Sequence, residues 1–172
     1  MPHGPREHLF TASSKAPPGE VRGVARTLAP AKVVTTTLTV STRARTEIQD
    51  LTERVAGLPG VNEIAHGSVL IHSLHTTTGL VINEHQDALH DDILTLLRTL
   101  IPEDNAYRHN DPAYSDCNRG NAWSHLGAVL LGQTVQVPIE QGHLVLGTWQ
   151  RVLFCELDGP QTRRLYAQVM GV

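Results

Sequence analysis

The sequence has little of several features that mark common classes of protein. Aromatic residues make up 4% of the 172 residues, and no run reaches the ~18 apolar residues of a membrane-spanning helix. The N-terminus also lacks the basic start and apolar stretch of a secretory signal. These absences argue against a membrane partner and favour residence in the cytoplasm.

The chain also lacks an excess of basic charge and any cysteine motif. Its formal net charge is -3 and its pI is near 6.3, with no dense Lys/Arg stripe to neutralise phosphates, so we expect no nucleic-acid partner. Cys117 and Cys155 lie far apart and outside any CxxC pattern. They predict neither a thiolate zinc site nor a disulfide framework, and we interpret both as reduced thiols, with Cys155 in a core strand.

Prolines and a lack of periodicity set the first part of the chain apart from the rest. Residues 1–31 include Pro2, Pro5, Pro17, Pro18 and Pro30, so we interpret them as a flexible Pro/Gly-rich N-terminal extension. Residues 32–172 have the length of one domain with a substantial core.

Hydrophobic patterns over residues 32–172 predict more strands than helices. Alternation predicts a first strand over Val33–Val40, and short apolar runs predict further strands over 67–74, 80–82, 135–139, 144–146, 152–157 and 165–169. Helical spacing predicts a short helix from Thr46 to Val55 and a longer one from Asp87 to Leu100 with a stripe of Leu89, Ile93, Leu96, Leu97 and Leu100. A third helix follows the cap Asn121 and buries Leu126, Val129 and Leu130. Because strands and helices do not alternate, we predict an α+β fold with a mostly antiparallel sheet.

Ten histidines are many for a chain of this length, and one of them follows an apolar strand. His75 comes just before Thr76, Thr77 and Thr78, so an imidazole and three hydroxyls gather where a strand ends and sites are common. The competing interpretation is structural: threonines favour strands, and the histidine satisfies a local carbonyl. Asn83 and Glu84 follow near the start of the longer helix, where Asn83 can be a cap and Glu84 a metal ligand, a general base or a solvated first-turn residue.

The loop over 103–121 carries a second group of polar residues. His109, Asn110, Asp111 and Asp116 lie on it, and His125 follows in the next helix. Histidine ligands favour zinc or another transition metal, whereas carboxylates favour magnesium, so the identity of a divalent metal ion stays open. The histidines at 3, 8, 66, 90 and 143 we interpret as solvated, and His72 as a packing residue.

Two further motifs lie in the C-terminal third. Gly147, Thr148, Trp149 and Gln150 interrupt two apolar strands, and a ring and an amide there can stack on and hydrogen-bond to a heterocycle, although a buried tryptophan at a bulge needs no ligand. Arg163 and Arg164 can bind an anion such as phosphate or form a surface salt bridge equally well.

The order of these motifs resembles the YjbQ family (UPF0047, secondary thiamine-phosphate synthase-like proteins) over about Val33–Val172. The matching elements are His75-Thr76-Thr77, Asn83-Glu84, His109-Asn110-Asp111, Ser124-His125-Leu126, Pro138-Ile139 with Gly142, Leu146-Gly147-Thr148-Trp149-Gln150, Asp158-Gly159-Pro160 and Val169-Met170-Gly171. The resemblance departs at Thr78-Gly79 and at Gln161, where relatives have small apolar residues and arginine, and the second departure weakens the anion-binding role.

The resemblance implies a homotrimer with a metal-assisted site for a small phosphorylated or anionic metabolite. It implies metal ligation by His75, His109 and His125, catalytic roles for Glu84, His75 and Gln150, and substrate contacts by Thr76, Thr77, Asn83, Thr148, Trp149 and Arg163. The implied reaction is weak thiamine-phosphate synthesis, in which a pyrimidine diphosphate joins a thiazole phosphate and pyrophosphate leaves. Two alternatives stay open: a trimeric binding protein for a metal or an anionic metabolite, and a purely structural assembly module.

Overall fold

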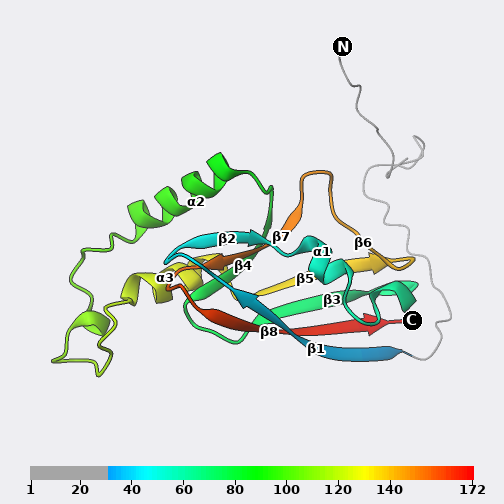
Figure 1. Cartoon of the computed structure of the whole chain (residues 1–172), viewed down its shortest axis with the longest axis horizontal. Helices are drawn as coiled ribbons and strands as arrows, with labels where there is room; N and C mark the ends of the chain where they lie inside the picture. Colours follow the sequence, from blue (N-terminus) through cyan, green and yellow to red (C-terminus); the bar gives the residue numbers. More distant parts are fainter. Residues whose placement is uncertain (1–30) are drawn as a thin grey trace, which may run out of the picture.

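The computed structural model describes residues 31–172, which form two antiparallel β-sheets and three α-helices (Figure 1). The strands are β1 (Lys32–Ser41), β2 (Glu47–Asp50), β3 (His66–Ser73), β4 (Thr78–Asn83), β5 (Thr134–Glu140), β6 (His143–Leu144), β7 (Arg151–Glu156) and β8 (Thr162–Gly171). The helices are α1 (Thr52–Ala56), α2 (Asp87–Leu100) and α3 (Ala122–Leu131). This confirms the predicted α+β class, while the predicted extension over 1–31 lies, except for Ala31, outside the described residues.

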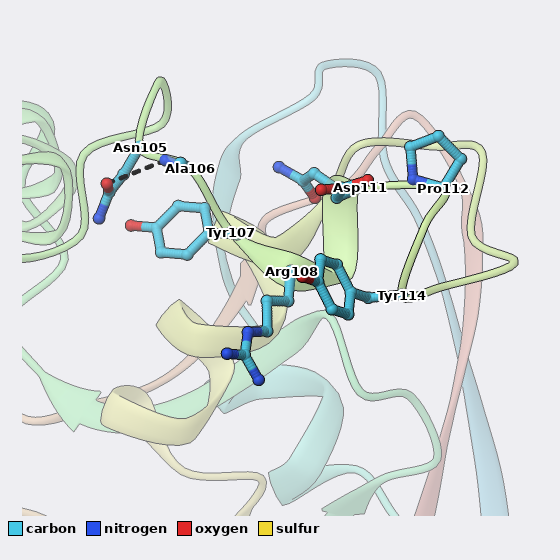
Figure 2. A pocket seen from close by; sticks show the side chains of 8 residues that line it. Asn105, Ala106, Tyr107, Arg108, Asp111, Pro112 and Tyr114 are labelled. Carbon is cyan, nitrogen blue, oxygen red and sulfur yellow. Dashed lines mark hydrogen bonds between the residues drawn. The ribbon is translucent and has the colours of Figure 1, made fainter.

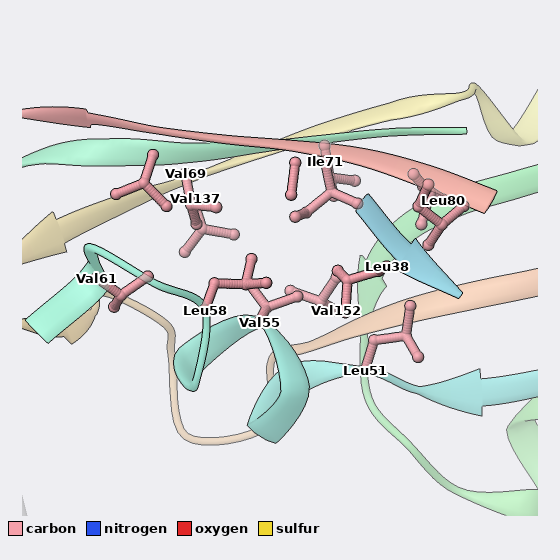
Figure 3. Close-up of a cluster of buried hydrophobic side chains, with 14 of the residues drawn as sticks. Leu38, Leu51, Val55, Leu58, Val61, Val69, Ile71, Leu80, Val137 and Val152 are labelled. Atoms are coloured by element: carbon pink, nitrogen blue, oxygen red, sulfur yellow. The ribbon is translucent and has the colours of Figure 1, made fainter. Parts of the chain in front are cut away.

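The larger sheet has the order β1-β8-β3-β5-β6 and the smaller sheet the order β2-β7-β4. The main core lies between the larger sheet and α1 with the smaller sheet. Figure 3 shows Val69 and Val137 of the larger sheet on one side of this core and Val55, Leu58 and Val152 on the other. All five are buried, and removing such side chains from water is the main force that holds the layers together.

The predicted helix over Thr46–Val55 is wrong in its first half. Residues Glu47–Asp50 form β2, in which Ile48 pairs with Cys155 of β7, and only the short helix α1 follows. The side chain of Asp50 accepts a hydrogen bond of 2.7 Å from the backbone N–H of Thr52, which helps the chain to turn from strand to helix. Pairing with a distant strand therefore overrides a local pattern that fits a helix.

Helix α3 begins next to Asn121 as predicted, but the predicted buried side is wrong. Leu126, Val129 and Leu130 are 40%, 76% and 57% exposed. The buried residues are mostly small and include Ser124, Gly127 and Ala128, because the helix lies close to the smaller sheet. A Cβ on Gly127 would come within 2.8 Å of a methyl group of Leu157, so small residues permit this approach and the larger ones face outward.

Helix α2 confirms the predicted bounds, and Figure 1 shows it standing away from the two sheets. Its buried apolar residue Leu97 packs with Ile101 and Trp123 in a second, smaller core, whereas Leu96 and Leu100 of the predicted stripe are exposed. Within residues 31–172, no helix has the length and apolar character needed to cross a membrane.

Candidate functional site

The most buried charged group of the described chain is an ion pair between neighbouring strands. Glu156 ends β7 and is fully buried, and Arg163 lies near the start of β8. The guanidinium donates two hydrogen bonds to the carboxylate, from Nε at 2.6 Å and from Nη2 at 2.7 Å. Arg163 Nη2 also donates to the hydroxyl of Thr77 at 3.2 Å, and Thr42 donates to Glu156 Oε2 at 3.4 Å. Arg163, predicted to contact substrate, is thus held mainly by the protein itself.

His75 lies close to this ion pair, just after β3. Its Nε2 accepts a hydrogen bond of 2.9 Å from the backbone N–H of Arg164, so the neutral ring carries its proton on Nδ1. Burial is the main reason that the pKa of His75 is below 6.5, and the positive charges of Arg163 and Arg164 lower it further against the opposing effect of Glu156. His75 is therefore a neutral ring with one nitrogen already in use.

The other two predicted metal ligands lie together. The rings of His109 and His125 meet edge to face, with centroids 4.8 Å apart and planes at 78°. They line a hollow of ≈ 360 Å³ together with Tyr107, Arg108, Ala122 and Leu126. Burial lowers the pKa of His125 below 6.5, the nearby His109 lowers it further, and Asp158 acts in the opposite direction. The two rings therefore lie in contact at the wall of one hollow.

The loop that carries His109 is fixed to the start of α3 and to the turn after β7. Asn110 Oδ1 accepts a hydrogen bond of 2.9 Å from the backbone N–H of Ala122. Asn121 does not cap the helix with its side chain but donates from Nδ2 to Asp158 Oδ2 at 2.8 Å. Arg119 Nε lies 3.0 Å from the same carboxylate oxygen. A loop held at both ends gives His109 a defined position.

The same loop forms a second hollow of ≈ 490 Å³, shown in Figure 2. The guanidinium of Arg108 lies 5.1 Å from the ring centroid of Tyr114, and Figure 2 shows the two side chains next to each other. Tyr107 and Arg108 line both this hollow and the one beside the imidazoles. A positive charge and aromatic rings therefore lie next to the His109 and His125 pair.

The predicted set of three imidazoles does not come together within one chain. His109 and His125 are in contact, but His75 turns toward β8. Over residues 31–172, no three His, Cys, Asp or Glu side chains are grouped so that they could hold a metal ion. A metal on the imidazole pair would thus need further ligands from solvent, from a bound molecule or from another subunit.

The motif before β7 lies on the surface. Figure 1 shows the connection from β6 to β7 projecting from the sheets, and Trp149 on it is 70% exposed. Gln150 turns back on the loop, where its Oε1 accepts a hydrogen bond of 2.7 Å from the backbone N–H of Gly147. Thr148 is exposed and its carbonyl accepts a hydrogen bond from Arg151. The substrate roles of Thr148, Trp149 and Gln150 stay predictions.

The remaining predicted residues are spread along β4 and the turn before it. Thr76 and Asn83 are exposed, Thr77 is buried against Arg163, and Glu84 is half-buried. Asn83 Oδ1 accepts a hydrogen bond of 2.9 Å from the backbone N–H of Glu84, which agrees with a local structural role. The described contacts do not connect these four residues to the imidazole pair.

Sequence reasoning missed two features. Glu156 stands between Cys155 and Leu157 in an apolar run, and a carboxylate in such a run is a signal of a buried, paired charge. His90, interpreted as solvated, is buried at 8% exposure and meets His85. The short spacing between His85 and His90 at the start of the predicted helix was the signal in the sequence that the two rings meet.

Comparisons with known proteins agree with the observed fold. The model of the family described as UPF0047 protein YjbQ-like matches residues 36–172. A UPF0047 protein of Archaeoglobus fulgidus is 45% identical over 133 residues, covering 77% of this chain and 98% of that protein. The UPF0047 protein YugU of Bacillus subtilis is 36% identical over 78% of this chain and 98% of its own length. A crystal structure of a YbjQ-like protein of unknown function from Sulfolobus solfataricus matches with a TM-score of 0.75 and 35% identity, over 83% of this chain and 99% of that one.

The comparisons overturn the predicted thiamine-phosphate synthase activity. These relatives are named only as UPF0047 proteins or as a protein of unknown function, and none of these names points to that reaction. The structure gives a physical reason against the predicted roles, since Arg163 neutralises Glu156 rather than facing an open diphosphate site. The predicted resemblance to the YjbQ family is confirmed. The family model spans most of the described residues, and the relatives are similar to this chain over nearly their whole length. The chain belongs to the YjbQ-like UPF0047 family.

Proposed function

We propose that this protein binds a small anionic metabolite next to a divalent transition-metal ion held by His109 and His125. The observation that carries the proposal is the contact of these two rings, 4.8 Å apart, beside a hollow that Arg108 also lines. A metal ion and a guanidinium together favour a ligand with phosphate or carboxylate groups.

The donor atoms fit one class of metal better than another. Imidazole nitrogens suit zinc, copper and nickel, whereas magnesium prefers oxygen ligands. The lowered pKa of His125 keeps this ring neutral at pH 7, as coordination requires. Of the two metals considered from the sequence, the proposal therefore takes zinc.

Two protein ligands leave coordination positions open. When bound, such an ion acts as a Lewis acid and accepts an electron pair from an oxygen atom of the ligand. His109 and His125 would hold the ion, Arg108 would attract the anion, and Tyr107 would limit the size of the hollow. Asn110 and Asn121 would fix the loop that carries His109.

We also propose that the protein works as a homotrimer in the cytoplasm. Leu126, Val129 and Leu130 expose an apolar face on α3 beside the imidazole pair, and lone soluble chains rarely leave such patches open. Leu126 lines the hollow itself, so a second copy that covered this face could add a ligand to the metal. The free thiol of Cys117 suits a reducing compartment.

Calorimetry with zinc tests the proposed metal site. We expect saturable binding to the untagged protein, weakened about tenfold or more in His109→Ala and in His125→Ala. His143→Ala is the matched control, because this exposed histidine bonds only to a carbonyl of its own turn among the described contacts. Equal zinc affinity in all three variants would remove the proposal.

Inorganic pyrophosphate tests the anion site in the zinc-loaded protein. We expect it to bind, and to bind less tightly in Arg108→Gln, because the positive charge beside the imidazoles is lost. Binding that is the same in Arg108→Gln and wild type would show that the anion lies elsewhere.

Catalysis is a second candidate function, favoured by the neutral state of His125 next to open coordination positions. An ion held by His109 and His125 would bind water at its open positions and lower the pKa of that water, which would supply a nucleophile near neutral pH. Hydrolysis of p-nitrophenyl phosphate that needs both zinc and His125 would establish it. Zinc and pyrophosphate binding with no turnover of this probe would leave binding as the function.

A further inference from the structure

A second pair of histidines lies at the start of α2, apart from the site described above. The rings of His85 and His90 meet edge to face with centroids 4.8 Å apart and planes at 84°. His85 is in the exposed segment before the helix, and His90 is in its first turn. Side chains on a helix point back toward its N-terminus, which brings the ring of His90 over the residue five positions earlier.

The ring of His90 carries an unused nitrogen. The residue is more than nine-tenths buried, and among the described residues its Nε2 is a buried polar atom without a hydrogen-bond partner. A buried nitrogen without a partner is unfavourable, and its presence calls for an explanation such as a missing ion or ligand. Burial is the main cause that lowers the pKa of His90 from 6.5, and the neighbouring His85 lowers it further.

The spacing of the pair matches a known arrangement of metal ligands. Four residues separate His85 from His90. Zinc-binding histidine pairs are typically separated by about 3–5 residues, which lets both rings reach one tetrahedral ion. Asp87 and Asp91 lie close enough to affect the charge of His90 and give the surroundings a negative potential that favours a cation.

We propose that His85 and His90 form a second transition-metal site, which takes zinc or a similar imidazole-binding ion. His90 Nε2 and a ring nitrogen of His85 are the ligands, and water completes the coordination. His85 is exposed, so its ring can turn to bring a nitrogen next to that of His90.

The place of this site in the fold indicates what the ion does. The apolar anchor of α2 is at its C-terminal end, where Leu97 and Ile101 pack with Trp123. The N-terminal end lies beside the connection from β4, and Figure 1 shows the helix standing away from the sheets there. An ion coordinated by both His85 and His90 fixes the N-terminal end of α2 to the segment that precedes it.

Zinc binding to a protein without the first imidazole pair tests the site. In untagged His109→Ala/His125→Ala protein we expect one remaining saturable zinc site and an increase in Tm on adding zinc. Adding His85→Ala should weaken the remaining site about tenfold or more and abolish the increase in Tm. His85 is the preferred position because it is exposed, whereas replacing buried His90 can itself destabilise the fold.

NMR of the histidine rings gives an independent measurement on the same protein. Zinc should shift the ring signals of both His85 and His90 and leave those of exposed His143 in place. Adding His143→Ala to the double variant should leave zinc affinity unchanged. No zinc binding in the double variant, or equal binding with and without His85, would overturn the proposal.

Discussion

Arg163 and Glu156 form a bidentate ion pair, in which Nε and Nη2 of the guanidinium lie 2.6 and 2.7 Å from the two carboxylate oxygens. Both side chains are buried, and the backbone N–H of Asp158 also donates to Glu156 Oε1 at 2.9 Å. Each charge is thus neutralised inside the protein. Removing one partner leaves the other charge without water or a counter-charge.

Glu156→Gln should therefore destabilise the protein strongly. We expect the free energy of unfolding to fall by about 3–5 kcal/mol, measured by urea denaturation. Glu103→Gln is the matched control, since Glu103 pairs with Arg45 and Arg98 at the surface and should change the value by about 1 kcal/mol or less. Similar losses in the two variants would contradict the argument from burial.

Stability should depend on pH in a defined direction. Burial is the main cause that lowers the pKa values of His75, His90 and His125 from 6.5. The unfolded chain then takes up protons at these positions at a higher pH than the folded chain does. The contribution of these three rings to the free energy of unfolding should be at its full value above pH 6.5. It should be lost as the pH falls from there through the lower pKa values of the folded state.

NMR titration checks this for each ring, because the midpoints of these three histidines should lie below 6.5. Urea denaturation at about pH 7.5 and about pH 5 checks the sum. A midpoint above 6.5 for any of the three would contradict the lowered pKa assigned to that ring.

Gly79→Ala should disturb the contact between β4 and α3. A Cβ at this position would lie 2.6 Å from Cβ of Leu131, so the helix must move away from the sheet. We expect a loss of about 1–3 kcal/mol in the free energy of unfolding. Gly57→Ala is the control, because its nearest heavy atom, a carbonyl oxygen of Glu53, is 3.4 Å away and in ordinary contact. A larger loss in the control would show that packing is not the cause.

Val129→Asp should weaken the proposed self-association. Val129 is highly exposed on α3, so a charge there is tolerated by one subunit but disfavoured under a second copy. We expect sedimentation velocity to show smaller species with an unchanged circular dichroism spectrum. Glu53→Lys on the exposed side of α1 should leave the assembly intact. A wild-type protein that sediments as a monomer would contradict the proposal.

The fold could be predicted where a local pattern and the tertiary environment agree. Val135, Val137 and Ile139 alternate with exposed residues, and they form a buried row on β5. The segment Glu47–Asp50 could not be predicted, because the partner strand β7 that makes it a strand lies about a hundred residues further along the chain and local spacing fits a helix.

The candidate site could be predicted in part, for a similar reason. His109 and His125 meet because a loop leads directly into a helix, and the sequence shows that order. The position of His75 depends on a hydrogen bond from Arg164 on β8, and that of Arg163 depends on Glu156. These contacts join strands that are distant in sequence, so residue types and spacing alone do not show them.

The end of β7 connects the ion pair of Arg163 and Glu156 with the helix that carries His125. The backbone N–H of Leu157 donates a hydrogen bond of 3.2 Å to the carbonyl of Thr77, and the carbonyl of Leu157 accepts one from the hydroxyl of Ser124 on α3. The carboxylate of Asp158 accepts a hydrogen bond from the side chain of Asn121. A substitution of Arg163 and a substitution of His125 should therefore change the free energy of unfolding by amounts that do not add in a double-mutant cycle. The backbone at Leu157 and Asp158 therefore couples the energetics of the ion pair to those of the site on α3.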